Sequence, residues 1–130
     1  MKVGEQDSIS KVITANDIDQ FAVITLDSNP IHLDNRFAEK TQFGERIAHG
    51  TLTGGLIGAV LGTKIPGPGT ILLSQTLEFK NPVYINDEIT ASVTIKKIDV
   101  KNAKTFYHCD SICTNQNGVI VLEGKSLLIK

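Results

Sequence analysis

A carboxylate and an imidazole lie close together in the stretch Asp27-Ser28-Asn29-Pro30-Ile31-His32. Pro30 locks one backbone dihedral and removes a backbone donor, so this loop can hold Asp27 and His32 toward one cleft. Histidine titrates near neutral pH, and a partly buried aspartate beside it can be tuned to accept a proton. Two such groups can hold and deprotonate one water molecule. A plain turn is the alternative for Asp27, because Asp and Asn often bond their own backbone.

Gly50 is the third candidate, because it follows His49 at the start of an apolar stretch that we predict to be helical. The amide of a first helical residue is unpaired and lies at the positive end of the helix dipole. Such an amide would polarise a substrate carbonyl and stabilise negative charge that develops on its oxygen. Gly50 could instead be only a flexible joint. We expect His49 to cap or orient the helix start, and His108 to be a hydrogen-bonded residue within a strand.

Two helices are predicted on either side of this loop. Thr14 is a good N-cap, and Asp17 follows it three residues later as in a capping box, so a helix is expected over residues 15–26. Pro30 marks the break after this helix, because the residue before a proline avoids the helical region. A second, short helix is expected to start near Asp34.

Residues 50–62 form the predicted central helix, and they are apolar on all sides and carry no charge. Each glycine inside a helix costs about 1 kcal/mol relative to alanine, so this helix would be weak if it were exposed. An uncharged helix that is apolar all round is normally buried. We therefore expect it to be buried, with its glycines at places where a sheet or a ligand approaches the backbone.

Alternation of apolar and polar residues dominates the second half of the chain and predicts β-strands. Asn117-Gly118 is a strong hairpin signal between the last two of them. With one short strand near the N-terminus, the expected strands cover residues 8–14, 71–80, 89–96, 105–114 and 119–129. This pattern predicts an α+β domain in which an antiparallel sheet wraps around the central helix. The exposed edges of such a sheet are often covered by edge-to-edge pairing in a dimer.

Length and composition narrow the class of protein. The chain has 130 residues, a hydrophobic content of 41% and a formal net charge of −1, which fit one globular domain. Its lysines are scattered, so we expect neither a nucleic-acid partner nor attachment to an anionic membrane. The polar N-terminus lacks the apolar core of a signal peptide, so a cytoplasmic location is expected. Cys109 and Cys113 lie four residues apart in one strand, about 13 Å from each other, and are expected to be reduced, buried thiols.

The stretch from Asp27 to Asp34 resembles the hydratase signature Asp-x-Asn-Pro-x-His-x-Asp of the MaoC-like dehydratases. The short (R)-specific enoyl-CoA hydratases of this family are the most similar. The resemblance continues with the same order and spacing over nearly the whole chain, through Phe37-Ala38, Phe43-Gly44, Ile47-Ala48-His49-Gly50, Leu61-Gly62, Pro66-Gly67, Phe79-Lys80-Asn81-Pro82-Val83 and Asp87-Glu88-Ile89-Thr90.

This resemblance implies one MaoC-like hot-dog domain over residues 1–130, a homodimer with further pairing left open, and reversible syn addition of water to trans-2-enoyl-CoA. It implies that Asp27 and His32 are the catalytic pair, which holds the water that adds to the β-carbon and delivers a proton to the α-carbon. The amide that binds the thioester oxygen matches Gly50, and Asn29 is expected to shape the loop. The resemblance implies no metal and no cofactor.

Two positions depart from the pattern of the family. Many members have glycine before the aspartate, where this chain has Leu26, which leaves the carboxylate in place. Several short members carry a serine on the central helix where this chain has Gly58, which removes a hydroxyl and leaves space. Gly58 and Leu61 would lie one turn apart on the same side of the helix, and our hypothesis is that they line an acyl tunnel.

Three alternatives stay open at this point. A hot-dog thioesterase would use one carboxylate and would not need His32. A non-catalytic acyl-CoA-binding module would need neither Asp27 nor His32, and the fold alone does not decide between these functions. The acyl group could also be carried on acyl carrier protein. If the carrier is CoA, Arg46, Lys64 and Lys80 are the basic candidates to meet its phosphates.

Overall fold

One five-stranded antiparallel sheet forms the body of the protein, with the strand order β1-β3-β4-β5-β2. The computed structural model describes all residues from Met1 to Lys130. The strands are β1 (Gln6–Val12), β2 (Ile71–Phe79), β3 (Glu88–Lys101), β4 (Lys104–Thr114) and β5 (Ile120–Ile129). The predicted α+β class and the five predicted strands are therefore confirmed.

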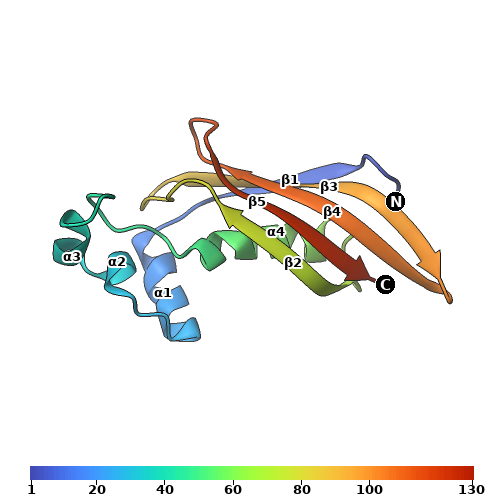
Figure 1. Cartoon of the computed structure of the whole chain (residues 1–130), viewed down its shortest axis with the longest axis horizontal. Helices are drawn as coiled ribbons and strands as arrows, with labels where there is room; N and C mark the ends of the chain where they lie inside the picture. Colours follow the sequence, from blue (N-terminus) through green and yellow to red (C-terminus); the bar gives the residue numbers. More distant parts are fainter.

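The helix α4 (Gly50–Thr63) lies along the inner face of the curved sheet, as predicted (Figure 1). It buries Leu56, Ile57, Val60 and Leu61 in a single hydrophobic core. The sheet contributes every second residue of β3 to the same core, namely Ile89, Ala91, Val93 and Ile95, each 0% exposed. The period of two in the sequence thus identified the inner face of the sheet correctly.

Three helices lie together at one end of the sheet, beside the start of α4 (Figure 1). These are α1 (Ala15–Thr25), α2 (Pro30–Leu33) and α3 (Asn35–Glu39). The capping box predicted for α1 is present, because Thr14 accepts from the amide of Asp17 and the Asp17 carboxylate accepts from the amide of Thr14. The Asp34 carboxylate caps α3. The helical turn α2, which contains His32, was not predicted.

The strands run slightly further than the sequence indicated at one end of the sheet. β3 continues to Lys101 and pairs with β4 up to Lys104. Asn102 and Ala103 join them with positive φ values of 53° and 63°. Sequence reasoning missed this tight turn because it lacks the Asn-Gly pair that marks the hairpin between β4 and β5.

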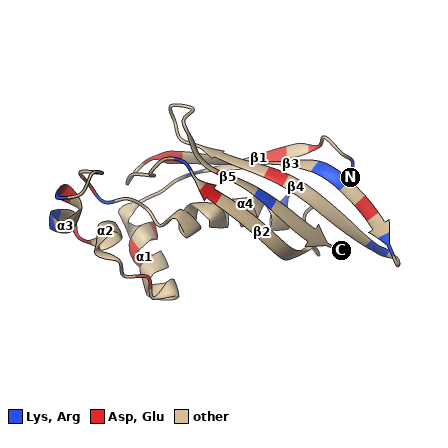
Figure 2. Ribbon diagram, viewed as in Figure 1, with Lys and Arg blue, Asp and Glu red and all other residues tan.

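Charged side chains are mixed in sign over the surface, and α4 carries none (Figure 2). No helix combines the length and the apolarity that crossing a bilayer requires. Cys109 and Cys113 are free and buried, as predicted. Burial raises the pKa of the two thiols to about 11 and about 12, so both stay protonated at neutral pH.

Candidate active site

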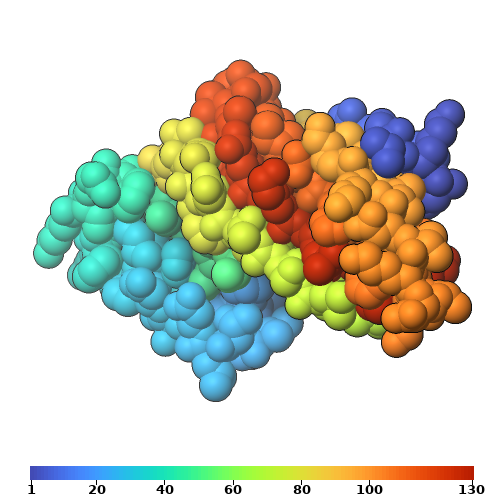
Figure 3. All heavy atoms as spheres, turned by 45° about the vertical axis from the view of Figure 1, so that its right-hand side comes forward, coloured from blue at the N-terminus to red at the C-terminus, as the bar shows by residue number.

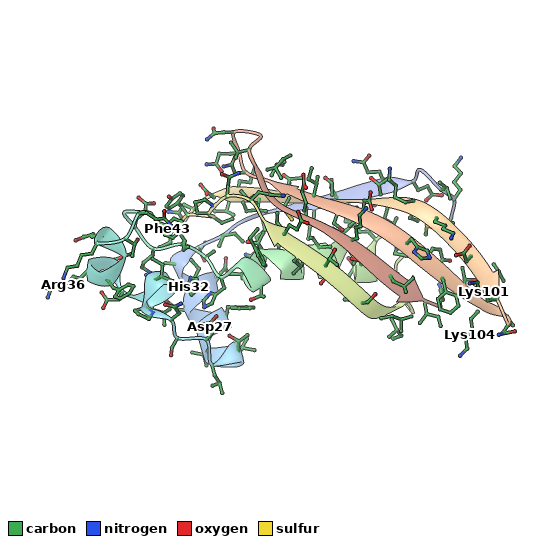
Figure 4. The ribbon with its side chains drawn as sticks, viewed as in Figure 1. Asp27, His32, Arg36, Phe43, Lys101 and Lys104 are labelled. Atoms are coloured by element: carbon green, nitrogen blue, oxygen red, sulfur yellow. The ribbon has the colours of Figure 1, made fainter.

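A cleft of about 440 Å³ opens where α1 and α2 meet the start of α4 and the end of β2. In Figure 3 the cyan and teal segment that contains α1 to α3 lies beside the yellow end of β2. The cleft is lined by Asp27, His32, Phe43, Ile47, Ala48, His49, Gly50, Thr51, Thr53, Phe79, Lys80, Asn81, Pro82, Val83, Val121 and Leu122. The three residues predicted to do chemistry, Asp27, His32 and Gly50, therefore line one cavity. Figure 4 shows Asp27 and His32 close together at this end of the molecule.

Asp27 stands in the turn that follows α1. Leu26 ends that helix in the left-handed conformation, with φ of 65°, and this reverses the chain toward the cleft. The Asp27 side chain accepts a bond of 3.3 Å from the Asn29 amide. Asp27 is exposed in the single chain, whereas the sequence analysis supposed a partly buried carboxylate. Asn29 is the N-cap of α2, where its side chain accepts from the amide of Ile31, and it does not line the cleft.

His32 is half-buried and is held from its Nδ1 side. Nδ1 lies 2.7 Å from the carbonyl oxygen of Ile47, and since a carbonyl oxygen only accepts, Nδ1 carries the proton. Nε2 is then the proton-accepting atom of the neutral ring. Burial lowers the pKa of His32 below its ordinary value of 6.5, and the neighbouring His49 adds to this, while Ile47 and Asp27 oppose it. His32 is therefore neutral at pH 7.

Gly50 is the first residue of α4, and its amide has no acceptor within its own helix. None of the backbone bonds outside the helices and strands involves this amide either. A Cβ atom built on Gly50 would lie 2.5 Å from the Phe79 ring. Only glycine lets the aromatic ring lie this close to the helix start. One turn further along, Thr53 is 2% exposed and lines the same cleft, and its hydroxyl is buried without a partner.

His49 is 1% exposed and makes no capping bond, so the predicted capping role is wrong. Its Nε2 lies 2.9 Å from the carbonyl oxygen of Asp27. Its ring stacks on His32, with centroids 3.9 Å apart and planes 29° from parallel, and it contacts Phe21 from α1. We also expected His49 to orient the start of α4. Its side chain instead binds the loop that contains Asp27.

Asp27, His32 and His49 each place one possible ligand atom within 4.8 Å of the others, so this cluster has the composition of a metal site. One nitrogen of each histidine is already bound to a backbone carbonyl. The two rings are nearly parallel, so the lone pairs in their planes run side by side. Zinc needs ligand lone pairs that converge on one point about 2 Å away. The arrangement suits proton transfer better than coordination of a metal.

Residues 3–116 match the family described as the MaoC like domain. The chain belongs to the MaoC-like family. It is 42% identical to an (R)-specific enoyl-CoA hydratase of Rhodospirillum rubrum, over 99% of this chain and 88% of that one. It is also 32% identical to a mitochondrial 3-hydroxyacyl-[acyl-carrier-protein] dehydratase of Arabidopsis thaliana, over 99% of this chain and 77% of that one.

Solved structures confirm the hot-dog fold of this MaoC-like domain. The (R)-hydratase from A. caviae involved in PHA biosynthesis superimposes with a TM-score of 0.91 at 34% identity, covering 98% of this chain and 96% of that one. The expectation of a sheet wrapped around a central helix is thereby confirmed for the whole described chain.

The basic residues of this MaoC-like domain differ in what they contact. The Arg46 guanidinium donates to the carbonyl oxygen of His32 and, at 2.9 Å, to the Asp19 carboxylate, so it braces the helices around the site. Lys64 does not line the cleft, and its ammonium lies 3.6 Å from the Asp7 carboxylate. Lys80 alone of the three lines the cleft, and it pairs with Glu78 at 2.8 Å.

Gly58 and Leu61 lie outside the lining of the cleft in the single chain. Gly58 is exposed, with nothing within 4 Å of a Cβ built on it, and Leu61 is 2% exposed in the core. The sequence analysis missed His49, Thr53 and Phe79 as parts of the site. Thr53 lies one turn beyond Gly50, so helical spacing could have indicated it, whereas Phe79 becomes adjacent only through the sheet.

Proposed function

We propose that the protein is an (R)-specific enoyl-CoA hydratase, a hydro-lyase that adds water reversibly to trans-2-enoyl-CoA and gives (R)-3-hydroxyacyl-CoA. The observation that carries the proposal is that Asp27, His32 and Gly50 line one cleft. Hydratase and dehydratase relatives that span nearly the whole chain support it.

The pair Asp27 and His32 holds the attacking water. His32 presents its unprotonated Nε2, because Nδ1 donates to Ile47, and the Asp27 carboxylate accepts the second hydrogen bond of the water. The water oxygen bonds to the β-carbon, one water proton passes to the pair, and a proton from the pair is delivered to the α-carbon on the same face. Net charge and atoms balance over the cycle, and the reverse sequence dehydrates the hydroxyacyl thioester.

The amide of Gly50 stabilises the enolate that forms between these two steps. It is unpaired, lies at the positive end of the α4 dipole and borders the cleft. Negative charge develops on the thioester oxygen only as the water adds, so a fixed amide at this point favours the transition state over the ground state. Removing one donor of this kind typically costs about 10² to 10³ in rate.

Lys80 is the basic residue best placed to meet a CoA phosphate, because it borders the cleft beside exposed Glu78. The ion pair with Glu78 can open at low cost because both groups are in solvent. An acyl carrier protein substrate would use the same thioester chemistry, and direct comparison of the two carriers decides between them.

The functional unit that we propose is a homodimer. The outer edge of β2 has no strand beside it, and Ile71, Leu72 and Leu73 on this strand are 62%, 44% and 50% exposed. Gly55 and Gly58 on the neighbouring flank of α4 are exposed as well. A second chain on this side would cover the apolar edge and extend the cleft along α4 toward Gly58 and Leu61, where an acyl tunnel would run. Sedimentation as a monomer at micromolar concentration would contradict this part.

The deciding experiment follows the ultraviolet absorbance of the enoyl thioester in crotonyl-CoA, with free thiol measured in the same sample. Wild type and Asp27→Asn are compared, with Asp110→Asn on the outer face of β4 as the matched control. We expect loss of the enoyl band without thiol release, about 10³-fold slower in Asp27→Asn and unchanged in Asp110→Asn. Thiol release would indicate a thioesterase. No reaction with the crotonyl group on CoA or on acyl carrier protein would indicate a binding module.

A further inference from the structure

His49 is the most buried histidine of the chain, and it touches both members of the proposed catalytic pair. Its ring lies between Phe21 of α1, with centroids 4.8 Å apart, and His32 of α2, with centroids 3.9 Å apart. Its Nε2 reaches the backbone carbonyl of Asp27, 22 residues away in the chain, at 2.9 Å. The single side chain thus connects the loop that bears the carboxylate to the ring that bears the free nitrogen.

The partners of the His49 ring determine which nitrogen carries its proton. The carbonyl oxygen of Asp27 can only accept, so the proton is on Nε2. Nδ1 is buried and has no partner of any kind. His49 therefore donates from Nε2 to the Asp27 carbonyl, and its Nδ1 has no group with which to exchange a proton.

The charged groups around the stacked rings of His32 and His49 also favour His32 as the residue that takes the proton. Arg46 donates to the carbonyl of His32, so a positive charge already lies on that side, and its guanidinium is occupied by Asp19. Asp27 is the only carboxylate beside the rings, and it is exposed and on the cleft side. His32 keeps a free Nε2 beside that carboxylate, whereas the free nitrogen of His49 is buried, so the proton taken from the water goes to His32.

The Asp27 loop has little else to fix it. Apart from the His49 contact, its bonds in this region are local. The amide of Ser28 donates to the carbonyl of Leu26, the amide of Asp27 to the Thr25 hydroxyl at 3.3 Å, and the amide of Asn29 to the Asp27 side chain. The turn starts at Leu26, which is in a conformation that non-glycine residues disfavour. A bond from a buried ring is thus the long-range constraint on the position of the Asp27 backbone.

We infer that His49 is a positioning residue, which fixes the Asp27 carboxylate relative to Nε2 of His32 and leaves His32 as the one histidine of the pair that exchanges a proton. This inference rests on the proposed hydratase function. His49 borders the cleft, but its free nitrogen is buried and its ring is occupied by His32 and by the Asp27 carbonyl, so it acts through these two neighbours.

Two substitutions separate its two contacts. His49→Phe keeps a ring against His32 but cannot donate to Asp27, and His49→Gln can place an amide N–H near the position of Nε2 but has no ring. We expect kcat for crotonyl-CoA to fall about 100-fold in His49→Phe with KM little changed, because a displacement of about 1 Å in a catalytic group has this size of effect. His49→Gln should recover part of that loss. His108→Gln on the outer face of β4 is the control and should match wild type.

A measurement that does not depend on turnover completes the test. In ¹⁵N-histidine-labelled wild type, we expect one buried ring with its proton on Nε2, distinct from the Nδ1–H form of His32, and this signal should vanish in His49→Gln. A proton on Nδ1 of His49 would overturn the inference even if the Phe variant does not fold. Equal kcat in wild type and a folded His49→Phe would also overturn it. An inactive wild type would overturn the proposed function and leave the NMR result to decide which nitrogen of His49 carries the proton.

Discussion

The first residue of α4 and the glycines farther along the same helix are in opposite surroundings. At Gly50 an added Cβ would lie 2.5 Å from the Phe79 ring, and at Gly54 it would meet Leu77 at 3.0 Å. At Gly55, Gly58 and Gly62 it would meet nothing within 4 Å. One end of the helix is therefore shaped by contacts that exist in the single chain. On the open flank of α4, formed by Gly55, Gly58 and Gly62, no contact within the single chain requires glycine. A second chain or an acyl chain that packs against this flank would require small residues there.

Among substitutions of the α4 glycines, Gly50→Ala should have the largest effect, because the new methyl group and the Phe79 ring cannot occupy the same space. Phe79 is 56% exposed and can swing away, so the fold should survive while the ring moves across the cleft beside the Gly50 amide. We expect kcat/KM for crotonyl-CoA to fall about 100-fold. Gly55→Ala on the open flank is the comparison variant. Its methyl group meets nothing within 4 Å in the single chain, so the helix itself should gain about 1 kcal/mol of stability.

Sedimentation of Gly55→Ala tests whether a second chain covers the open flank of α4. If Gly55→Ala weakens the dimer in sedimentation experiments, the open flank of α4 is an interface and the small residues allow close approach. If Gly50→Ala keeps full activity, moving the Phe79 ring does not disturb the access of substrate to this amide, which alanine retains.

The pH dependence should reflect the buried His32 ring. Because burial lowers its pKa below 6.5, the neutral form that accepts a proton persists at pH 6.5 and is lost only at lower pH. We expect kcat/KM to fall about tenfold per pH unit below the pKa of the folded enzyme, with this acid limb centred below pH 6.5. A limb centred at or above pH 6.5 would contradict a buried, neutral His32.

The free energy of unfolding should also decrease at low pH because of His32. The unfolded chain binds a proton at His32 near pH 6.5, whereas the folded chain binds it only at lower pH, so the free energy of unfolding decreases as the pH falls from 6.5 to the folded pKa. Chemical denaturation of wild type and His32→Gln at pH 7 and pH 5.5 measures this contribution, which should be absent in the variant.

Leu26→Gly should stabilise the loop beside the site by a small amount. Leu26 is 84% exposed and has φ of 65°, a region that costs a non-glycine residue about 1 kcal/mol. The gain is partly offset because glycine loses more entropy on folding. Ala103→Gly in the hairpin between β3 and β4, with φ of 63°, is the control at the far end of the sheet. If both variants are stabilised to a similar extent and only Leu26→Gly has an altered kcat, the conformation of Leu26 affects the reaction.

Gly58→Ser should have the smallest effect. It adds a hydroxyl on the open flank of α4, away from the cleft of the single chain. If the acyl tunnel runs along this flank, the ratio of kcat/KM for octenoyl-CoA to that for crotonyl-CoA should change by about tenfold, the low end of the roughly 10–200-fold that one group in such a pocket is worth. An unchanged ratio would remove Gly58 from the tunnel.

Much of the fold follows from short-range patterns in the sequence. The capping box of Thr14 and Asp17 fixes the start of α1, the uncharged run from Gly50 identifies the buried helix, and period-two alternation identifies the inner face of β3. These signals depend on residues within a few positions of one another, so the chain carries them before it folds. The Asp27 and His32 pair was predictable for the same reason, since one turn separates the two residues.

Other features were decided only when distant segments packed together. The sequence gives no sign that Phe79 lies over Gly50, or that His49 binds the Asp27 carbonyl instead of capping α4. Thr53 could be assigned to the predicted helix, but only its packing surroundings leave its hydroxyl buried without a partner. Local propensity sets which elements form, whereas the side chains that face the cleft depend on the strand order and on how α1 and α2 close over the start of α4. Short-range patterns therefore predict the elements and the reactive pair, whereas the contacts that hold this pair arise only from long-range packing.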